Sequence, residues 1–258
     1  MRRHLSLIVG LSLLSASAPA AAIQFTPFAG YTTVNMTTVN ESINAAETFI
    51  EVLGSSGPGL KVAFRNNQKV TSAWVVGGEL LSDRLTPWQS LSLGVRGEYL
   101  QTNLGQLTTD SLPGMSLDYE LFGNLSNFML GGRYQVPGDW HGVGLSVGAF
   151  AGLGYAEMHQ SMAAIHRNDL FNGEGFVGDV DLNLHWAPAS FTHTRFNALL
   201  GYRYASLGNL SNGAGQPLKP LTGTFLAGLP GSPFVNHQGG MDVDFSGLNV
   251  GGGFSLSF

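Results

Sequence analysis

The 258-residue sequence has no cysteine, few charged side chains and, after residue 22, no apolar run that would span a membrane as a helix. Without cysteine there is no disulfide framework, no thiolate chemistry and no lipid-modified N-terminal cysteine. Charged residues make up only 11% of the chain, and 17 acids outnumber 12 Lys and Arg. An acidic chain gives no electrostatic reason to bind nucleic acid. We therefore predict no nucleic-acid partner, and no motif predicts a cofactor or a metal site.

The N-terminus has the pattern of an export signal. Arg2 and Arg3 precede an apolar run at residues 5–14 and a stretch of small residues that ends at Ala22. This order is typical of a cleaved secretory signal peptide, and the run is shorter than the roughly 20 residues that a spanning helix needs. We predict that residues 1–22 are removed and that residues 23–258 form the mature domain. Loss of the two arginines takes the formal charge from −5 to −7.

The last segment, residues 244–258, alternates between two kinds of side chain. Leu248, Val250, Phe254, Leu256 and Phe258 share one face, and small or polar residues occupy the other. This period of two is typical of a strand with one apolar and one polar face. A terminal strand must pair along its edge, and an apolar outer face with a small, polar inner face indicates a closed barrel in lipid. The 36 glycines and 43% hydrophobic residues fit that class better than a globular domain.

Seven more segments show the same alternation. They are residues 24–35, 70–82, 89–103, 126–136, 143–158, 175–186 and 194–207. With the terminal segment they predict an all-β, antiparallel, up-and-down transmembrane barrel of eight strands. The connections alternate between short and long, as in outer-membrane barrels with short periplasmic turns and long extracellular loops. Residues 40–53 have helical spacing within the first long loop, and the alternative is a hairpin at residues 48–64 that would make ten strands.

Aromatic residues fall near both ends of the predicted strands. Such residues form belts at the two interfaces of a membrane, roughly 25 Å apart in barrels of this class. The predicted girdle residues are Trp74, Trp88, Tyr99, Trp140, Tyr155, Trp186, Tyr204 and Phe258.

These patterns resemble a known family. Gly253, Leu256 and Phe258 look like the C-terminal assembly signal of bacterial outer-membrane barrels. The mature chain as a whole resembles the eight-stranded barrels typified by the transmembrane domain of outer membrane protein A and by OmpX. The resemblance implies a place in the outer membrane among lipid and lipopolysaccharide, and assembly by the barrel-assembly machinery through the C-terminal strand.

Charged residues on the inward face of the strands form the main candidate site. They are Glu79, Arg96, Glu98, Arg133, Asp179, Asp181, Arg195 and Arg203. An eight-stranded barrel is only wide enough for side chains to fill it, so four acids and four arginines should pair with one another. We predict a lumen plugged by ion pairs. The alternative is a narrow channel or small-solute porin.

A second candidate lies near the end of the fifth predicted strand. Glu157, His159 and Ser161 share one face at a spacing of two, and such a trio could act as base, nucleophile and orienting group. His159 and Ser161 are similar to the H-x-S element of the outer-membrane lipid A deacylase, which implies a lipid A-modifying enzyme. In that family the element lies in the penultimate strand, where this chain has no histidine. We therefore predict a polar collar above the lipid, and no enzyme.

The long loops carry the remaining functional information. The last loop, residues 208–243, is unusually apolar, so it either folds over the barrel mouth or binds a partner or an apolar ligand. We predict a structural or surface-interaction role that depends on the extracellular loops, with a surface ligand bound there.

Overall fold

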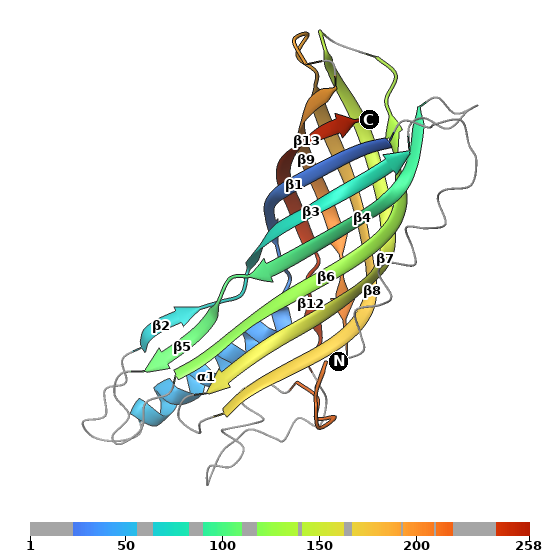
Figure 1. Cartoon of the computed structure of the whole chain (residues 1–258). Coiled ribbons are helices and arrows are strands. Elements are labelled where there is room, and N and C mark those ends of the chain that lie inside the picture. The colour runs from blue at the N-terminus through green and yellow to red at the C-terminus, as the bar shows by residue number, and fades with distance from the viewer. Residues whose placement is uncertain are drawn as a thin grey trace.

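A computed structural model of the chain describes residues 23–55, 64–82, 90–109, 118–138, 141–162, 167–191, 193–208, 210–218 and 241–258. Eight long strands of this part form a closed antiparallel barrel (Figure 1). They are β1 (Ile23–Thr33), β3 (Ser72–Ser82), β4 (Leu91–Thr102), β6 (Asp118–Gln135), β7 (Val143–Met162), β8 (Arg167–Trp186), β9 (Thr194–Tyr204) and β13 (Gly247–Ser257). The predicted fold class and strand number are confirmed.

The barrel closes because the first and last strands pair. Tyr31 of β1 lies opposite Val250 of β13, and the pairing runs down to Gln24 opposite Ser257. Each remaining strand pairs with its neighbours around the ring, from β1 through β3, β4, β6, β7, β8 and β9 to β13. No long strand of the ring therefore has an unpaired edge within the barrel, which a structure in lipid requires.

Side chains along the barrel strands separate by polarity as the alternation predicts. Large apolar residues face outward, with Leu153 70%, Leu130 61% and Val250 59% exposed. Charged and amide side chains face the lumen and are buried there. An apolar exterior around a polar interior matches a barrel surrounded by lipid.

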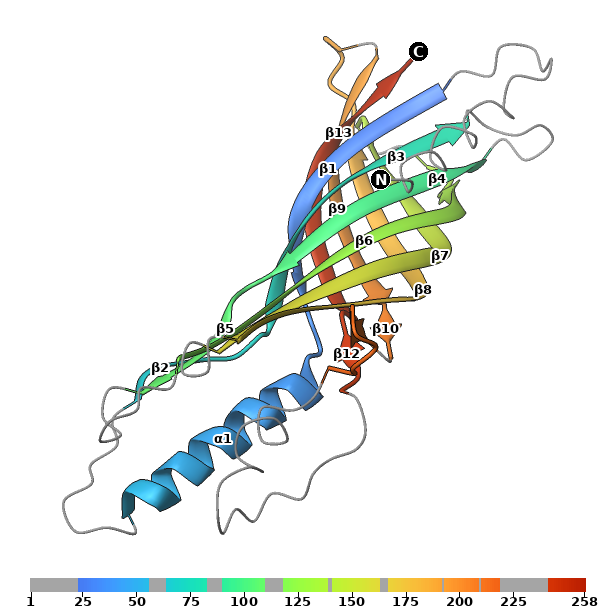
Figure 2. The same cartoon turned by 60° about the horizontal axis from the view of Figure 1, so that its bottom comes forward.

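The end opposite the chain's C-terminus is closed by a second layer of structure (Figures 1 and 2). Helix α1 (Thr37–Ser55) lies there, and strands β6, β7 and β8 continue past the barrel beside it. Short strands β2 (Phe64–Gln68) and β5 (Gly105–Thr109) widen this sheet, and β11 (Ser211–Asn212) pairs with β8. Strands β10 (Ser206–Leu207) and β12 (Val243–Asp244) pair with each other. We call α1, the extended sheet and residues 205–218 and 241–245 the cap.

The cap encloses an apolar core. Val39, Ile43 and Ala46, which share one face of α1, are buried. Inward side chains of the sheet and the neighbouring segments complete this core: Leu100, Leu107, Tyr119, Leu121, Leu125, Ala156, Met158, Phe171, Val177, Leu207, Leu210, Leu218, Met241, Val243 and Phe245. Full burial raises the pKa of Tyr119, which lies beyond the barrel, to about 12. The core therefore covers the extracellular mouth of the barrel.

The structure decides between eight and ten strands, and several elements are longer than predicted. The helix predicted at residues 40–53 is confirmed and is longer, so the alternative of ten strands is wrong. The strands predicted to begin at residues 126 and 175 begin at Asp118 and Arg167, because they continue into the cap. The signal peptide, Trp88, Trp140 and residues 219–240 of the last loop lie outside the described residues.

Candidate functional site

Charged side chains fill the middle of the lumen. Arg96 on β4 donates to Glu79 on the neighbouring strand, with 2.6 Å between its Nη2 and the Glu79 Oε2. It also crosses the lumen to β8, where its Nη1 lies 2.8 Å from Asp179 Oδ1 and its Nη2 contacts Asp181. The Arg96 side chain is 4% exposed. One guanidinium therefore joins acids from two separate walls of the barrel.

Two aromatic rings hold the same guanidinium. The carbon centre of the Arg96 guanidinium lies 4.0 Å from the ring centroid of Phe150 and 5.5 Å from that of Phe28. Both rings point inward, from β7 and β1. Cation–π contacts are strongest where the cation is shielded from water, as it is here. The alternation along residues 143–158 predicts that Phe150 points inward, but it gives no sign of this contact.

Arg133 forms the second junction of the network. Its Nε lies 2.9 Å from Glu79 Oε1, and its Nη1 lies 2.8 Å from Asp181 Oδ1. Arg133, Gly148 and Asp181 are in register across β6, β7 and β8. A β-carbon at Gly148 would lie 3.0 Å from both carboxylate oxygens of Asp181. Glycine at this position therefore leaves the space that the ion pair occupies.

The third junction lies nearer the cap. Arg203 on β9 donates to Glu98 across the lumen at 2.6 Å. Asn127 donates to the same Glu98 oxygen at 3.1 Å, and Asn249 donates to Asp179 at 2.7 Å. A cavity of about 30 Å³ lies among these groups, far smaller than the roughly 300 Å³ of the smallest pockets for drug-sized molecules.

Arg195 departs from the predicted pattern. It was expected to join the lumen ion pairs, but no described acid lies within ion-pair distance of it. The reason is its height along the barrel. Asp181 lies opposite Gly201 on β9, six residues from Arg195, or about 20 Å at the rise of a strand. Of the eight residues predicted to pair in the lumen, seven therefore interact with one another and Arg195 lies apart.

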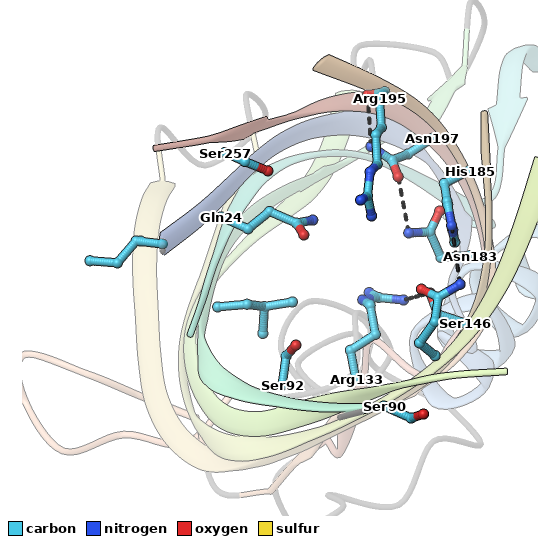
Figure 3. A pocket seen from close by; sticks show the side chains of 13 residues that line it. Gln24, Ser90, Ser92, Arg133, Ser146, Asn183, His185, Arg195, Asn197 and Ser257 are labelled. Atoms are coloured by element: carbon cyan, nitrogen blue, oxygen red, sulfur yellow. Dashed lines mark hydrogen bonds between the residues drawn. The ribbon is translucent and has the colours of Figure 1, made fainter. Parts of the chain in front are cut away.

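Arg195 instead lines a polar cavity of about 320 Å³ at the end of the barrel where the short turns lie (Figure 3). Arg133 and Ser146 form its inner wall, and His185, Asn183 and Asn197 lie beside them. A second hollow of about 340 Å³ shares Arg195 and His185 and adjoins the turn after β6. No carboxylate lines either space among the described residues.

Polar contacts hold the cap to the barrel. The side-chain amide of Asn40 on α1 donates to the carbonyl of Val70 at 2.8 Å and accepts from the amide nitrogen of Val70 at 3.0 Å. Thr38 donates to the carbonyl of Asp242 at 2.6 Å. These contacts attach the start of the helix to two separate segments of the extracellular end.

The candidate trio of Glu157, His159 and Ser161 lies on the outer face of the extended part of β7. No hydrogen bond joins the three side chains to one another within the described residues. His159 stacks instead on Phe122 of β6, with ring centroids 4.6 Å apart and planes 6° apart. Glu157 lies opposite Asn124 on one side and Asn172 on the other. The trio shares a face but does not form a base–nucleophile pair.

The girdle residues that the structure describes are all exposed on the barrel exterior. The exposed fraction is 69% for Trp74, 50% for Trp186 and 78% for Phe258. Tyr31 packs edge-on against Trp74, with centroids 5.4 Å apart, and Trp186 packs against Phe196 at 6.1 Å. Tyr99 and Tyr155 both flank Ser126 in the strand register, at one level of the barrel. Tyr204 is also exposed.

The net charge of the described residues is concentrated at the extracellular end. The four acids and four arginines of the lumen balance each other. Among the described residues, the extracellular end has three bases, Arg65, Lys69 and Arg167, against ten acids. The acids are Glu41, Glu47, Glu51, Asp118, Glu120, Glu157, Asp169, Glu174, Asp242 and Asp244.

Two kinds of feature are absent from the described residues. No helix among them is both long and apolar enough to cross a membrane. Within the same residues, no group of three or more His, Asp or Glu side chains is placed to hold a metal ion.

Comparison with known proteins gives a distant structural likeness. No protein-family model matches the chain, and no curated protein matches it. Among solved structures, the chain is similar to Ail, the attachment invasion locus protein of Yersinia pestis, in complex with the heparin analogue sucrose octasulfate. That match has 9% identity and a TM-score of 0.44, and covers 91% of this chain and 99% of the other. A second structure of Ail matches at 10% identity and a TM-score of 0.39, covering 90% and 98% of the two chains.

Proposed function

We propose that this protein is an outer-membrane barrel that works through its extracellular surface, with a lumen closed to solutes. One observation carries the proposal: the barrel is filled at two levels, while a structured cap with a large excess of acids projects from its extracellular end. In this proposal residues 1–22 direct export, and Gly253, Leu256 and Phe258 are recognised by the barrel-assembly machinery. The cap stands clear of lipid and lipopolysaccharide and meets the surface ligand.

The closed lumen follows from the two filled levels. The ion-paired arginines and acids occupy the middle of the barrel, and the cavity that they line there measures about 30 Å³. The apolar cap core lies above them, over the mouth. A hydrated ion would have to disrupt both a buried charge network and an apolar core. Disrupting a buried pair costs about 3–5 kcal/mol by itself, so steady transport is strongly disfavoured.

The cap favours a cationic partner. One face of α1 presents Glu41, Glu47 and Glu51 to solvent, and this face carries no basic residue. Charge complementarity accelerates encounter with partners of the opposite sign and repels partners of the same sign. We therefore propose a basic protein or peptide surface as the ligand class. A sulfated ligand of the kind bound to Ail does not suit this acidic surface.

The enzyme alternative has less support. A nucleophilic mechanism needs a nucleophile and a base within hydrogen-bond reach of each other. In this chain the ring of His159 is packed flat on Phe122, and no hydrogen bond links it to Ser161. We propose that Glu157, His159 and Ser161 form a polar collar above the lipid, and that the protein is not an enzyme.

Conductance tests the closed lumen. The refolded protein, inserted into planar bilayers, should show no steady stepwise conductance in potassium chloride. Stepwise conductance of the wild type that disappears when the protein is omitted would refute the closed lumen and support the channel alternative.

Surface binding tests the acidic cap. Cells that display the wild type should bind a basic peptide such as polylysine more tightly than cells that display the triple variant Glu41→Gln, Glu47→Gln and Glu51→Gln. The matched control is the double variant Asn44→Ala and Thr48→Ala, which changes the same face of α1 without changing its charge. Equal binding by the triple variant and the wild type would contradict the proposed ligand class.

A further inference from the structure

The polar cavity at the turn end of the barrel has a chemical character that the proposed surface role does not use. In a mature chain of formal charge −7 it is lined by two arginines and a histidine, and by no described carboxylate. The rest of its lining is mostly hydroxyl and amide groups, including those of Ser90, Ser92 and Asn183. We propose that this cavity binds a small oxyanion of the phosphate or sulfate class, which enters from the periplasm.

Arg195 is the central residue of the proposed site. Its guanidinium forms no ion pair with a described acid, and its one hydrogen bond to a described side chain is made by its backbone carbonyl, which accepts from Asn197 at 3.3 Å. A guanidinium offers five N–H donors in a planar fork that matches two oxygens of a phosphate or sulfate. Figure 3 shows its side chain pointing into the cavity toward the opposite wall.

Arg133 provides the facing wall. In Figure 3 its guanidinium points up toward that of Arg195 from the other side of the cavity. Its acid partners, Glu79 and Asp181, are not among the residues that line the cavity. Arg133 already has two acid partners, whereas Arg195 pairs with no described acid, so Arg195 is the arginine whose charge remains for an anion.

The volume of the cavity and its closed inner end limit the size of the ligand. Pockets for drug-sized molecules measure roughly 300–1,000 Å³, and this cavity of about 320 Å³ lies at the lower limit. It therefore suits a small ion that keeps part of its water shell. The charged layer and the cap close the lumen beyond it. The site is thus a closed-ended vestibule, and it does not depend on the acidic surface at the opposite end.

Inorganic phosphate is the probe for the test. The full mature chain in detergent micelles is titrated with phosphate at constant ionic strength, and the side-chain Nε–Hε resonances of arginine are followed by NMR. We expect the Arg195 resonance to shift and to saturate with a dissociation constant in about the millimolar range, as suits one or two charge-assisted hydrogen bonds. Sulfate should compete, and acetate should bind more weakly because it carries a single charge.

Variants separate a specific site from general attraction. Arg195→Gln should weaken phosphate binding by at least about tenfold, and Arg195→Lys should retain part of it. The matched control, Arg65→Gln at the extracellular end, should bind as the wild type does. A shift that does not saturate, or an unchanged affinity in Arg195→Gln, would overturn the proposal.

A second variant keeps the test decisive if Arg195→Gln fails to fold. Ser92→Asp leaves Arg195 in place and introduces a carboxylate on the cavity wall. Ser92 lies directly opposite Arg133 in the strand register, so that carboxylate would pair with Arg133 and repel an anion in the cavity. Phosphate binding should therefore be lost while the folded barrel still migrates faster than the boiled protein on a gel. Wild-type affinity in Ser92→Asp would also overturn the proposal.

Discussion

Replacement of Arg96 by Met tests whether the lumen network stabilises the barrel. The substitution removes contacts to Glu79, Asp179 and Asp181 together. Glu79 and Asp181 keep Arg133 as a partner. Asp179 keeps only Asn249 and a distant Arg203, whose Nη2 lies 3.9 Å away. The main loss is therefore the uncompensated charge of Asp179.

The magnitude follows from that loss. Removal of one partner from a buried ion pair costs about 3–5 kcal/mol, because a charge is left in a medium that solvates it poorly. We expect Arg96→Met to lower the free energy of unfolding by that amount. Adding Asp179→Asn removes the stranded charge, so the double variant should recover at least about 1 kcal/mol of the loss.

Urea unfolding in lipid vesicles provides the assay, followed by tryptophan fluorescence and by the difference in gel mobility before and after boiling. Arg195→Met is the matched control, since it removes an arginine from the same lumen without breaking an ion pair. It should change stability by less than about 0.5 kcal/mol. If Arg96→Met and Arg195→Met fall within a few tenths of each other, the lumen is wet and the network contributes little.

Three more predictions address the neighbouring features. Gly148→Val should displace the carboxylate of Asp181 and lower the unfolding free energy by about 3 kcal/mol, whereas Gly97→Val, whose β-carbon would lie 3.9 Å from the carbonyl oxygen of Asn127, should be nearly neutral in the same urea assay. Ile43→Ala should cost the cap about 2–5 kcal/mol and speed amide hydrogen exchange in α1, while exchange in the barrel strands stays slow. Ser161→Ala should leave the lipid A mass spectrum of the cell unchanged, and a difference from the wild type would revive the enzyme alternative.

The fold was largely predictable because lipid imposes one simple rule on every barrel strand. Leu145, Val147 and Leu153 alternate with small or polar residues along β7, and their side chains face outward in the structure. The segment at residues 143–158 was therefore assigned correctly from its pattern alone. The helix in the first loop was predictable for a related reason, because Ile43 and Ala46 have the spacing of one buried helical face.

The interactions of the lumen were only partly predictable. Alternation shows which side chains point inward, but the partner of each charge depends on height along the barrel, which follows from strand register. Arg195 illustrates the limit, since it points inward as its position in the alternation predicts but lies too far along β9 to reach a described acid. Phe28 alternates with Thr26 and Gly30 on the inward face of β1. This spacing was the signal that could have placed Phe28 in the lumen near Arg96.

The strand extensions at residues 118–125 and 167–174 were missed for a physical reason. In the barrel the apolar residues of β6 face outward, as Phe128 and Leu130 do, whereas in the cap its apolar residues face inward, as Tyr119 and Leu121 do. The apolar residues thus change from the outward face to the inward face along a single continuous strand. A strand predicted from one continuous apolar face therefore ends where the apolar residues change face, near Ser126.

The same change of face occurs in the neighbouring strands and marks where the barrel leaves the lipid. On β7 the outward face changes from Leu153 and Tyr155 to Glu157, and the inward face becomes apolar at Ala156 and Met158. Outside the hydrocarbon, water solvates the outer face, so the apolar side chains must turn inward to find a core. The point at which the apolar residues change face therefore indicates, from the sequence, where the strand leaves the membrane. The described residues beyond it form a cap with an apolar core and a polar outer face, which supports the proposal that the extracellular surface meets a partner.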